Sequence, residues 1–210
     1  SVSGSELTIS STGVLTFVTA PDFETKSTYN ATVTVSDGTN STTQDITVNV
    51  TNVNEAPTFT SSATFSAAEN QTAIGTVTAT DADGNSLTYS VSGSELAINS
   101  STGVLTFVNA PDYETKNTYT ATVTVSDGTN STTQDITVNV TNLNDNTPSI
   151  TSGATFSAAE NQTAIGTVTA TDADGNLNNL TYSVSGSELA INSSTGVLTF
   201  VNAPDYETKN

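Results

Sequence analysis

The sequence predicts an all-β protein built from tandem seven-stranded β-sandwiches. Three observations lead to this prediction. A block of about ninety residues recurs along the chain, several stretches alternate apolar and polar residues at every second position, and turn residues separate these stretches. Alternation with a period of two is the pattern of a half-buried strand. Many short strands, with a turn about every ten residues, are typical of a β-sandwich.

The copies of the repeated block are nearly identical. Only six of 42 aligned positions differ between residues 14–55 and 104–145. Only one of 25 differs between residues 61–85 and 152–176. Such self-similarity marks an array of supersecondary units that pack against their neighbours. We therefore expect a longer parent protein with further copies of the same unit.

The chain contains one complete repeat between two partial ones. Ser1 aligns with Ser90, so the first repeat lacks the segment that matches residues 58–89. The last repeat stops at Asn210, which aligns with Asn117, before the two long strands expected there. We interpret the chain as a window from a longer protein, the alternative being that neighbouring chains supply the missing strands by strand addition. The predicted domains are residues 1–56 (partial), 57–147 (complete) and 148–210 (partial).

Seven strands are expected in the complete repeat. Residues 119–126 and 136–141 alternate strictly, and residues 127–130 form the turn between them. Threonine dominates their outer faces, where β-branched side chains suit a pleated surface. The five shorter strands are predicted at residues 58–66, 74–80, 87–92, 96–98 and 104–108. The expected core consists of Phe65, Ile74, Val77, Leu87, Tyr89, Val91, Leu96, Ile98, Val104, Leu105, Phe107, Tyr119, Ala121, Val123, Val125, Ile136, Val138 and Val140.

The composition excludes several classes of function. The chain has 21 acidic residues against three lysines, a net charge of −18 and no histidine or cysteine. Nucleic acid and anionic lipid are therefore not expected partners, because phosphate recognition needs lysine and arginine. No apolar run is long enough to insert into a membrane. A catalytic triad or thiol nucleophile is excluded within these residues, so we do not expect an enzyme. Without disulfides, metal is the obvious alternative means of stabilisation.

The acidic residues are concentrated in recurring positions, mostly in predicted turns and loops. Ca²⁺ takes 6–8 oxygen ligands from carboxylates, amides and backbone carbonyls, whereas the absence of His and Cys disfavours zinc and copper. A solvated acidic surface, or simple turn formation at Asp37 and Asp127, is the alternative explanation. The recurring positions are Asp22, Glu24, Asp37, Glu55, Glu69, Asp81, Asp83, Asp112, Glu114, Asp127, Asp145, Glu160, Asp172, Asp174, Asp205 and Glu207.

Taken in order, these motifs resemble the cadherin repeat. Cadherin domains carry an early Glu, a D-x-D pair, a D-R-E-like pair, a late Asp and a D-x-N-D-N linker. The matching residues here are Glu69 and Glu160, Asp81 with Asp83, Asp172 with Asp174, Asp22 with Glu24, Asp112 with Glu114, Asp205 with Glu207, the late Asp37 and Asp127, and the linker at residues 142–146. The resemblance covers the whole chain and implies Greek-key sandwiches with Ca²⁺ between repeats.

The sequence departs from the cadherin pattern in its linkers. Asn52 and Asn142 stand where cadherins have the first linker Asp, and Glu55 and Ala56 replace the later Asp and Asn of the first linker. The strand-exchanging Trp of animal cadherins is absent, which argues against that mode of homophilic adhesion by this segment.

The resemblance implies two to three Ca²⁺ ions at each junction between repeats. The implied ligands of the first junction are Asp22, Glu24, Asn52, Asn54, Glu55, Asp81, Asp83 and Asp127. Those of the second junction are Glu69, Asp112, Glu114, Asn142, Asn144, Asp145, Asn146, Asp172 and Asp174.

The leading hypothesis is a calcium-rigidified extender or stalk of a large, secreted bacterial cell-surface adhesin. Bacterial giant adhesins with cadherin-like repeats are similar in acidity, threonine content and lack of cysteine. The expected partners are neighbouring repeats of the same chain, with possible homotypic lateral or end-to-end contacts, and the expected location is extracellular. The alternatives are a subunit of an extracellular filament or sheath, and an accessory module of a secreted polysaccharide-degrading enzyme.

Overall fold

The computed structural model describes residues 1–175 and 180–208, and every regular element in that part of the chain is a β-strand. The all-β prediction is therefore confirmed. The described residues contain no helical segment with the length and hydrophobicity needed to span a bilayer. The strands are β1 (Leu7–Ile9), β2 (Leu15–Phe17), β3 (Thr28–Ser36), β4 (Ser41–Asn49), β5 (Thr58–Phe59), β6 (Thr64–Ala68), β7 (Ala73–Thr76), β8 (Ala79–Thr80), β9 (Thr88–Val91), β10 (Leu96–Ile98), β11 (Val104–Phe107), β12 (Thr118–Ser126), β13 (Ser131–Thr141), β14 (Ser149–Ile150), β15 (Ala164–Thr167), β16 (Ala170–Thr171), β17 (Leu189–Ile191) and β18 (Val197–Phe200).

The strands of the central repeat form the two sheets of a sandwich. One sheet has the order β6-β13-β12-β9 and the other has the order β10-β11-β7, while β5 and β8 form a small additional pair. Strand β6 runs parallel to β13, with Thr64 opposite Thr137. Strand β9 runs antiparallel to β12, with Val91 opposite Val123. This arrangement confirms the predicted β-sandwich.

Each sheet contributes one apolar face to the core. Leu105, Val123, Val125 and Val138 are 0% exposed, and full burial of such a side chain contributes about 1.5–3 kcal/mol. The prediction that Val104 belongs to the core is wrong, because this residue is 43% exposed. Successive residues of a strand face opposite sides of the sheet. Since Leu105 points inward, its neighbour Val104 must point outward.

Two of the predicted strands are divided between different pairs. Residues 58–66 give β5 and β6, and residues 74–80 give β7 and β8. Strand β5 pairs with β8, whereas β6 pairs with β13, so the chain changes partner between them. Strand β13 begins at Ser131, five residues earlier than predicted. The polar first residues of β13 are bonded to β12: the Thr122 hydroxyl on β12 donates to Asp135 Oδ1 on β13 at 2.7 Å.

The chain divides into two compact units. One consists of Ser1–Ala63, Gly75–Thr106 and Ala121–Ile136, and the other of Thr64–Ile74, Phe107–Thr120 and Thr137–Asn210. The division passes through the central repeat. Each unit therefore contains all the residues predicted for one of the two junctions. The domain boundaries expected after residues 56 and 147 stay a prediction.

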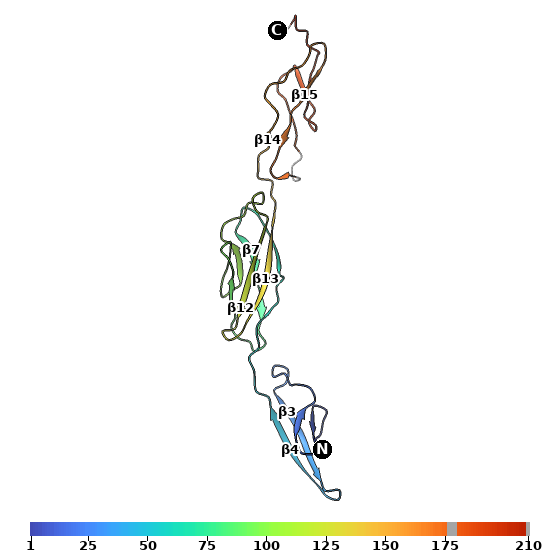
Figure 1. The fold of residues 1–210 in the computed structure, drawn as a ribbon, viewed down its shortest axis with the longest axis vertical. Helices are drawn as coiled ribbons and strands as arrows, with labels where there is room; N and C mark the ends of the chain where they lie inside the picture. The colour runs from blue at the N-terminus through green and yellow to red at the C-terminus, as the bar shows by residue number, and fades with distance from the viewer. Residues whose placement is uncertain (176–179, 209–210) are drawn as a thin grey trace. The chain divides into compact units, whose positions relative to one another are not determined.

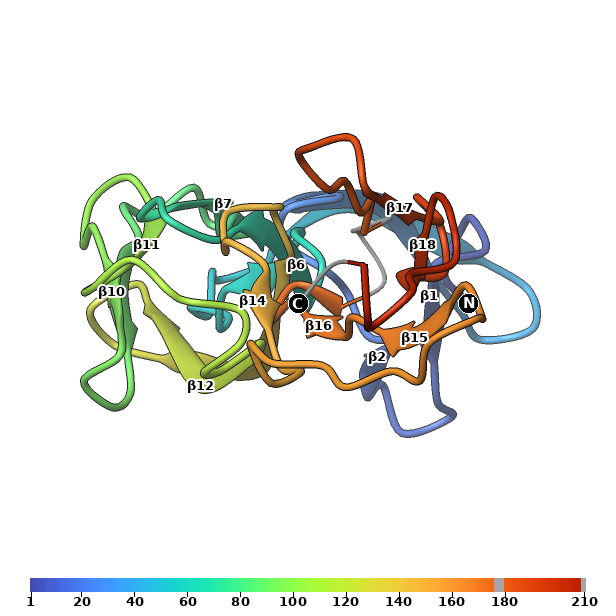
Figure 2. The same ribbon diagram turned by 90° about the horizontal axis from the view of Figure 1, so that it is seen from above.

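The partial repeats form some of the strands of the central repeat, but residues 155–159 and 181–184, which align with β6 and β9, are not strands. In the first repeat, β3 and β4 make a long antiparallel hairpin, with Thr28 opposite Asn49 (Figure 1). Val35 in this hairpin is 63% exposed, whereas its counterpart Val125 in the central repeat is buried. In the third repeat, β15, β18 and β17 form one sheet, and β14 pairs with β16 (Figure 2).

Candidate metal centres

Each Pro-Asp-x-Glu segment folds into a tight turn that frees its glutamate. Asp22 Oδ1 accepts hydrogen bonds from the backbone N–H groups of Glu24 (3.0 Å) and Thr25 (3.3 Å), and Asp22 Oδ2 accepts one from the Thr25 hydroxyl (2.9 Å). These bonds, first of all that from the Thr25 hydroxyl, lower the pKa of Asp22. Asp112 repeats the pattern in the central repeat. The aspartate thus shapes the turn, as such side chains commonly do, and the glutamate is available for other contacts.

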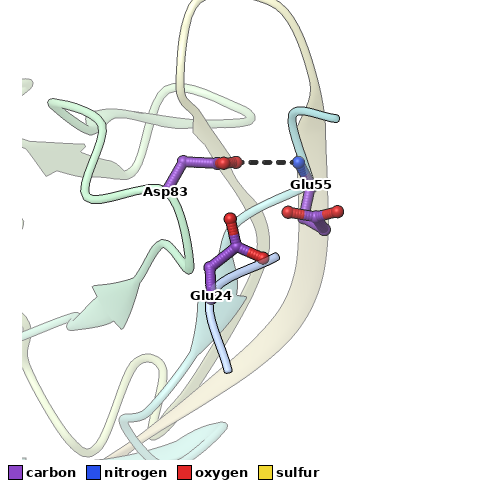
Figure 3. Close-up of side chains that lie close together, drawn as sticks. All are labelled: Glu24, Glu55 and Asp83. Carbon is purple, nitrogen blue, oxygen red and sulfur yellow. Dashed lines mark hydrogen bonds between the residues drawn. The ribbon is translucent and has the colours of Figure 1, made fainter. Parts of the chain in front are cut away.

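Three carboxylates from separate segments converge in what we call the first centre. Glu24 follows β2, Glu55 lies in the linker after β4, and Asp83 follows β8; their carboxylate oxygens lie within 4.8 Å of one another (Figure 3). The backbone N–H of Glu55 donates to Asp83 Oδ2 at 2.9 Å. The Asn52 amide donates to Asp83 Oδ1 at 2.8 Å. The linker is therefore tied to the D-x-D loop of the central repeat.

The first centre is electrostatically strained. Desolvation raises the pKa of Glu24, and the neighbouring charges of Glu55 and Asp83 raise it further. The pKa of Glu55 is raised in the same way, first by desolvation and then by the charge of Asp83. The Glu55 backbone N–H and the Asn52 amide lower the pKa of Asp83. A cation at this position would relieve the repulsion among all three groups.

A network of amides connects the first centre to the late Asp of the central repeat. The Asn54 amide donates to Asp127 Oδ2 at 2.8 Å and its Oδ1 accepts from the Asn85 amide at 2.6 Å. Asp127 Oδ1 accepts two backbone N–H groups of its own turn, those of Thr129 and Asn130. These bonds, the one from Asn130 first, lower the pKa of Asp127.

The second centre is built around a buried glutamate. Glu69 is 2% exposed; its Oε2 accepts the backbone N–H of Tyr113 at 2.8 Å and its Oε1 accepts that of Leu143 at 2.6 Å. These bonds tie Glu69 to the turn of the Pro-Asp-x-Glu motif and to the linker. The carboxylates of Asp112 and Glu114 lie close to it, with oxygens of all three within 4.8 Å. Desolvation, and then the charge of Glu69, raise the pKa of Glu114.

Glu114 also belongs to a second trio of carboxylates, with Asp145 of the linker and Asp174 of the third repeat. Asp174 is 2% exposed, and its Oδ2 accepts the backbone N–H of Asn146 at 2.9 Å. The amide of Asn142 donates to the backbone carbonyl of Asp174 at 3.1 Å. We use the name second centre for Glu69, Asp112, Glu114, Asp145 and Asp174 together.

The residues present fit a hard divalent cation. Five buried side-chain atoms in the described part of the chain lack a hydrogen-bond partner, and three of them are oxygens of predicted ligands: Asp81 Oδ2, Asn142 Oδ1 and Asp172 Oδ2. Buried acceptors are normally paired, so such orphans call for an explanation. Coordination of Ca²⁺ would satisfy them, since that ion takes carboxylate and amide oxygens. The donor set contains oxygen only, as the chain has no His or Cys.

The structure brings together eight of the predicted ligands as clustered carboxylates: Glu24, Glu55, Glu69, Asp83, Asp112, Glu114, Asp145 and Asp174. Four more contact a clustered residue by hydrogen bonds: Asn52, Asn142, Asn146 and Asp172. Asp22 shapes the turn of Glu24, and Asn54, Asp81 and Asp127 are linked to one another through Asn85. Asn144 is exposed and lines a surface pocket with Asp172. Their role as metal ligands stays a prediction.

A third acidic cluster is formed by residues that the motif order placed in the cadherin pattern but assigned to no metal site. Glu160, Asp205 and Glu207 converge in the third repeat, with oxygens within 4.8 Å of one another. The repeat itself was the signal, because Glu160 occupies the position of Glu69. Asn70 was also missed: it has a left-handed backbone conformation (φ 61°), which Asn tolerates, and its amide donates to Asp145 Oδ2.

Comparison with known families identifies the central unit of this architecture. Residues 63–141 match the family model described as "Cadherin domain". The central repeat thus resembles a cadherin domain over most of its length. The flanking repeats share its sequence almost residue for residue, so the predicted cadherin-like tandem repeats are confirmed.

The chain spans only a small part of the curated proteins that resemble it. It is 36% identical over 154 residues to human protocadherin Fat 4, a match that covers 65% of this chain and 3% of that protein. It is 39% identical over 127 residues to chitinase A of Pseudoalteromonas piscicida, covering 59% of this chain and 15% of that enzyme. Cadherin-like sequence of this kind therefore occurs in an animal protocadherin and in a bacterial chitinase.

Solved structures agree with the cadherin assignment. The protocadherin gammaB7 EC3-6 cis-dimer structure has a TM-score of 0.73 and 26% identity, covering 99% of this chain and 59% of that chain. Mouse cadherin-23 EC22-24 has a TM-score of 0.66 and 25% identity, covering 96% of this chain and 73% of that chain. Their similarity confirms the cadherin-type β-sandwich predicted from the sequence.

Proposed function

We propose that this chain is a stretch of calcium-rigidified extender repeats from a large, secreted protein of a bacterial cell surface. Cadherin domains are extracellular modules of adhesion, and residues 63–141 of this chain match that family. The role is mechanical: the repeats separate a distal binding region from the cell, and calcium at the junctions sets their stiffness. Repeats stacked in a linear array interact mainly with their immediate neighbours.

The observation that carries this proposal is the convergence of carboxylates from three segments at one point. In the first centre, Glu24 comes from the first repeat, Glu55 from the linker and Asp83 from the central repeat. A cation bound to all three would join both repeats to the linker. Surface carboxylates that served only solubility would have no reason to gather from three segments.

The negative charge of the chain favours a bound cation at each junction. The chain carries a net charge of −18, and each centre adds like charges at short range. Like charges repel, and a desolvated site strengthens the repulsion. Calcium supplies two positive charges there and reverses the sign of the interaction. Extracellular calcium modules typically bind at about 10⁻⁴–10⁻³ M, so calcium-rich surroundings would keep the junctions stiff.

The chain's own hydrogen bonds prepare each centre for a cation. In the second centre, Glu69 would present its carboxylate from a fixed position, because two backbone N–H groups hold both of its oxygens. In the first centre, the Glu55 N–H and Asn52 amide orient Asp83. Glu24, Glu55 and Asp83 would hold calcium at the first junction, and Glu69, Asp112, Glu114, Asp145 and Asp174 at the second. Two to three ions per junction is the proposed stoichiometry.

Small-angle scattering of the 210-residue chain tests the proposal. We expect calcium to narrow the distribution of interatomic distances and chelator to broaden it, since the junctions then lose the ion that joins neighbouring repeats. Sodium chloride at matched ionic strength is the control for simple screening. Identical scattering curves with calcium and with chelator would overturn the proposal. Calorimetric titration would separately measure the number of ions bound.

A filament or sheath subunit is a second candidate, favoured by one observation. Val35 is 63% exposed in the β3–β4 hairpin and Ile150 is 70% exposed in the third repeat, whereas the core of the central repeat is closed. Segments matching the rest of a repeat, from the same protein or from a second copy, would cover these faces. Sedimentation at increasing concentration distinguishes the candidates, because a subunit would form ordered higher oligomers and an extender segment would not.

The match to chitinase A supports a third candidate, an accessory module of a secreted polysaccharide-degrading enzyme. The match covers 127 residues and only 15% of that enzyme. In such a protein the repeats would space or orient a catalytic domain. Direct binding to polysaccharide is a separate property, which co-sedimentation with insoluble chitin would measure. Retention of the chain on chitin would favour this candidate over the extender role.

A further inference from the structure

One amide in the second linker occupies the middle of a group of carboxylates. Asn146 Nδ2 donates to Asp145 Oδ1 at 2.9 Å, to Asp174 Oδ1 at 3.0 Å and to Glu114 Oε2 at 3.2 Å. The oxygens of these three acids lie within 4.8 Å of one another. An amide NH₂ has two hydrogens, so it shares them among three negatively charged acceptors. Hydrogen bonds to charged acceptors are stronger than those between neutral groups.

This amide and a bound cation would compete for the same acceptor oxygens. The NH₂ group is the positive end of the amide dipole and has no lone pair for a metal, so it cannot serve as a ligand. A calcium ion held by the three carboxylates would lie about 2.3–2.6 Å from their oxygens. The amide hydrogens would then face a positive charge. Binding of the ion therefore requires the Asn146 side chain to rotate away.

The backbone of Asn146 need not move when its side chain does. Its N–H donates to the other oxygen of Asp174, Oδ2, at 2.9 Å. The linker can thus stay attached to the third repeat while the amide leaves. At the first junction the aligned residue is Ala56, which has no amide, and the Asn52 amide donates to one carboxylate of the trio, that of Asp83.

We propose that the Asn146 side chain is a built-in substitute for a cation: it holds Glu114, Asp145 and Asp174 together when calcium is scarce and is displaced when calcium binds. This inference rests on the proposed calcium-binding function. It explains how a junction with so much negative charge keeps its order during a fall in calcium. It also assigns the two junctions different behaviour, because the substitute is present only at the second.

Hydrogen–deuterium exchange of the full chain tests this inference with Asn146→Ala. In chelator, we expect exchange at residues 143–146 to become about tenfold faster, the equivalent of about 1.4 kcal/mol. In a calcium titration, the same segment should become protected at a severalfold lower calcium concentration, since the competitor of the ion has been removed. A merely structural role, or a role as a calcium ligand, would instead weaken binding.

Two further variants complete the test. Asn139→Ala removes an exposed amide on β13, outside both centres, and should change neither measurement. Asn146→Asp keeps the size of the side chain but replaces the donors with a negative charge, so it should accelerate exchange in chelator more than Asn146→Ala does. Unchanged exchange in chelator for both Asn146 variants, or a fall in calcium affinity for Asn146→Ala, would overturn the inference. Absence of any calcium-dependent protection in the wild-type chain would instead overturn the proposed function, while the chelator arm would still test the amide bridge.

Discussion

The two junctions have acidic residues at the same motif positions, but the surroundings of these carboxylates differ. In the first, Glu24 and Glu55 both have a raised pKa, caused by desolvation and then by neighbouring carboxylates. In the second, Glu69 is pinned by two backbone N–H groups, and Asp174 receives both the N–H and the amide of Asn146. A preorganised site loses less freedom on binding. Equal motifs therefore do not make equal sites.

The linkers also dock one residue apart. At the first junction the N–H of Glu55 donates to Asp83, whereas at the second the N–H of Asn146 donates to Asp174, one position later along the linker. The acidic residue of the first linker is a glutamate and that of the second is an aspartate. Glu55 has one methylene more than an aspartate, so its carboxylate can reach the first centre while its own backbone N–H is bonded to Asp83. We therefore expect the length of this one side chain to set the register of the linker.

The largest effect should come from removing the buried glutamate of the second centre. Glu69→Ala leaves the N–H groups of Tyr113 and Leu143 without their acceptor and removes a central carboxylate. In the calcium-loaded chain, we expect the free energy of unfolding of the part that contains Glu69 to fall by about 3 kcal/mol, because two hydrogen bonds to a charged acceptor are lost. Thermal and chemical unfolding in calcium would measure it.

Glu69→Gln is the matched control for that prediction. It keeps the size of the side chain and one carbonyl oxygen, so it should destabilise less than Glu69→Ala while still weakening calcium binding. Exchange at residues 52–56 of the first linker should be unchanged in both variants, because the hydrogen bonds of Glu69 go to Tyr113 and Leu143 of the second centre. Equal stability of the alanine variant and the wild type would show that the second centre is not better organised than the first.

A smaller effect is expected from neutralising the equivalent aspartates of the two D-x-D loops. Asp83→Asn and Asp174→Asn each remove one carboxylate from a trio but keep its shape. Each should raise the calcium needed for half-saturation of its own junction by about tenfold or more, and leave the other junction unchanged. Residue-resolved NMR titration would report both junctions in one sample. A shift at both junctions from a single substitution would break the view that they bind independently.

The fold was predictable because its dominant signal is local. Strict alternation placed β12 and β13 and the turn between them, and the repeat extended that assignment to β3 and β4. The change of partner between β5 and β6 was not predictable, because a period of two shows that a face is buried but not which sheet buries it. Val104 was misassigned for a related reason: hydrophobicity alone was counted, although its neighbour Leu105 had already taken the inward position.

The proximity of the carboxylates was predictable, whereas the hydrogen bonds that amides donate to them were not. Motif order assigned Glu24 with Asp83, and Glu114 with Asp174, to common junctions, and the structure brings the carboxylates of each pair close together. Asn70 was not among the predicted ligands, whereas Asn146 was predicted as a calcium ligand. The hydrogen bonds that their amides donate to Asp145 and Asp174 depend on backbone conformation and side-chain rotation. Such contacts are set by tertiary geometry. Sequence spacing carries no information about them.

One substitution in the first linker should give it the register of the second linker. Glu55→Asp shortens the side chain by one methylene, so the carboxylate can reach the first centre only if the linker moves. We expect the N–H bonded to Asp83 to change from that of residue 55 to that of Ala56, as found at the second junction. Amide exchange by NMR would show protection moving by one position. Asp145→Glu is the reciprocal variant, and unchanged protection in both would show that side-chain length does not set the register.

The smallest effect concerns pH in the calcium-stripped chain. The raised pKa values of Glu24 and Glu55 mean that the folded first junction takes up protons more readily than the unfolded chain. Their contribution to stability is therefore complete below the ordinary glutamate pKa of about 4.3 and is lost as pH rises through the raised values. The lowered pKa of Asp83 acts in the opposite sense: its contribution is present above the ordinary aspartate pKa of about 3.9 and is lost as pH falls through the lowered value.

The opposite pH dependences of the two glutamates and of Asp83 place the greatest stability of the calcium-free first junction at about pH 4. Thermal unfolding between about pH 3 and pH 7 should show a decline on the neutral side of that optimum, as the glutamates ionise against one another. Glu55→Gln removes one of the interacting charges and should flatten the decline. Calcium should abolish it, because the ion compensates the same charges. A stripped wild-type chain that becomes steadily more stable from about pH 4 to pH 7 would contradict the raised glutamate pKa values, and with them the electrostatic difference between the two junctions.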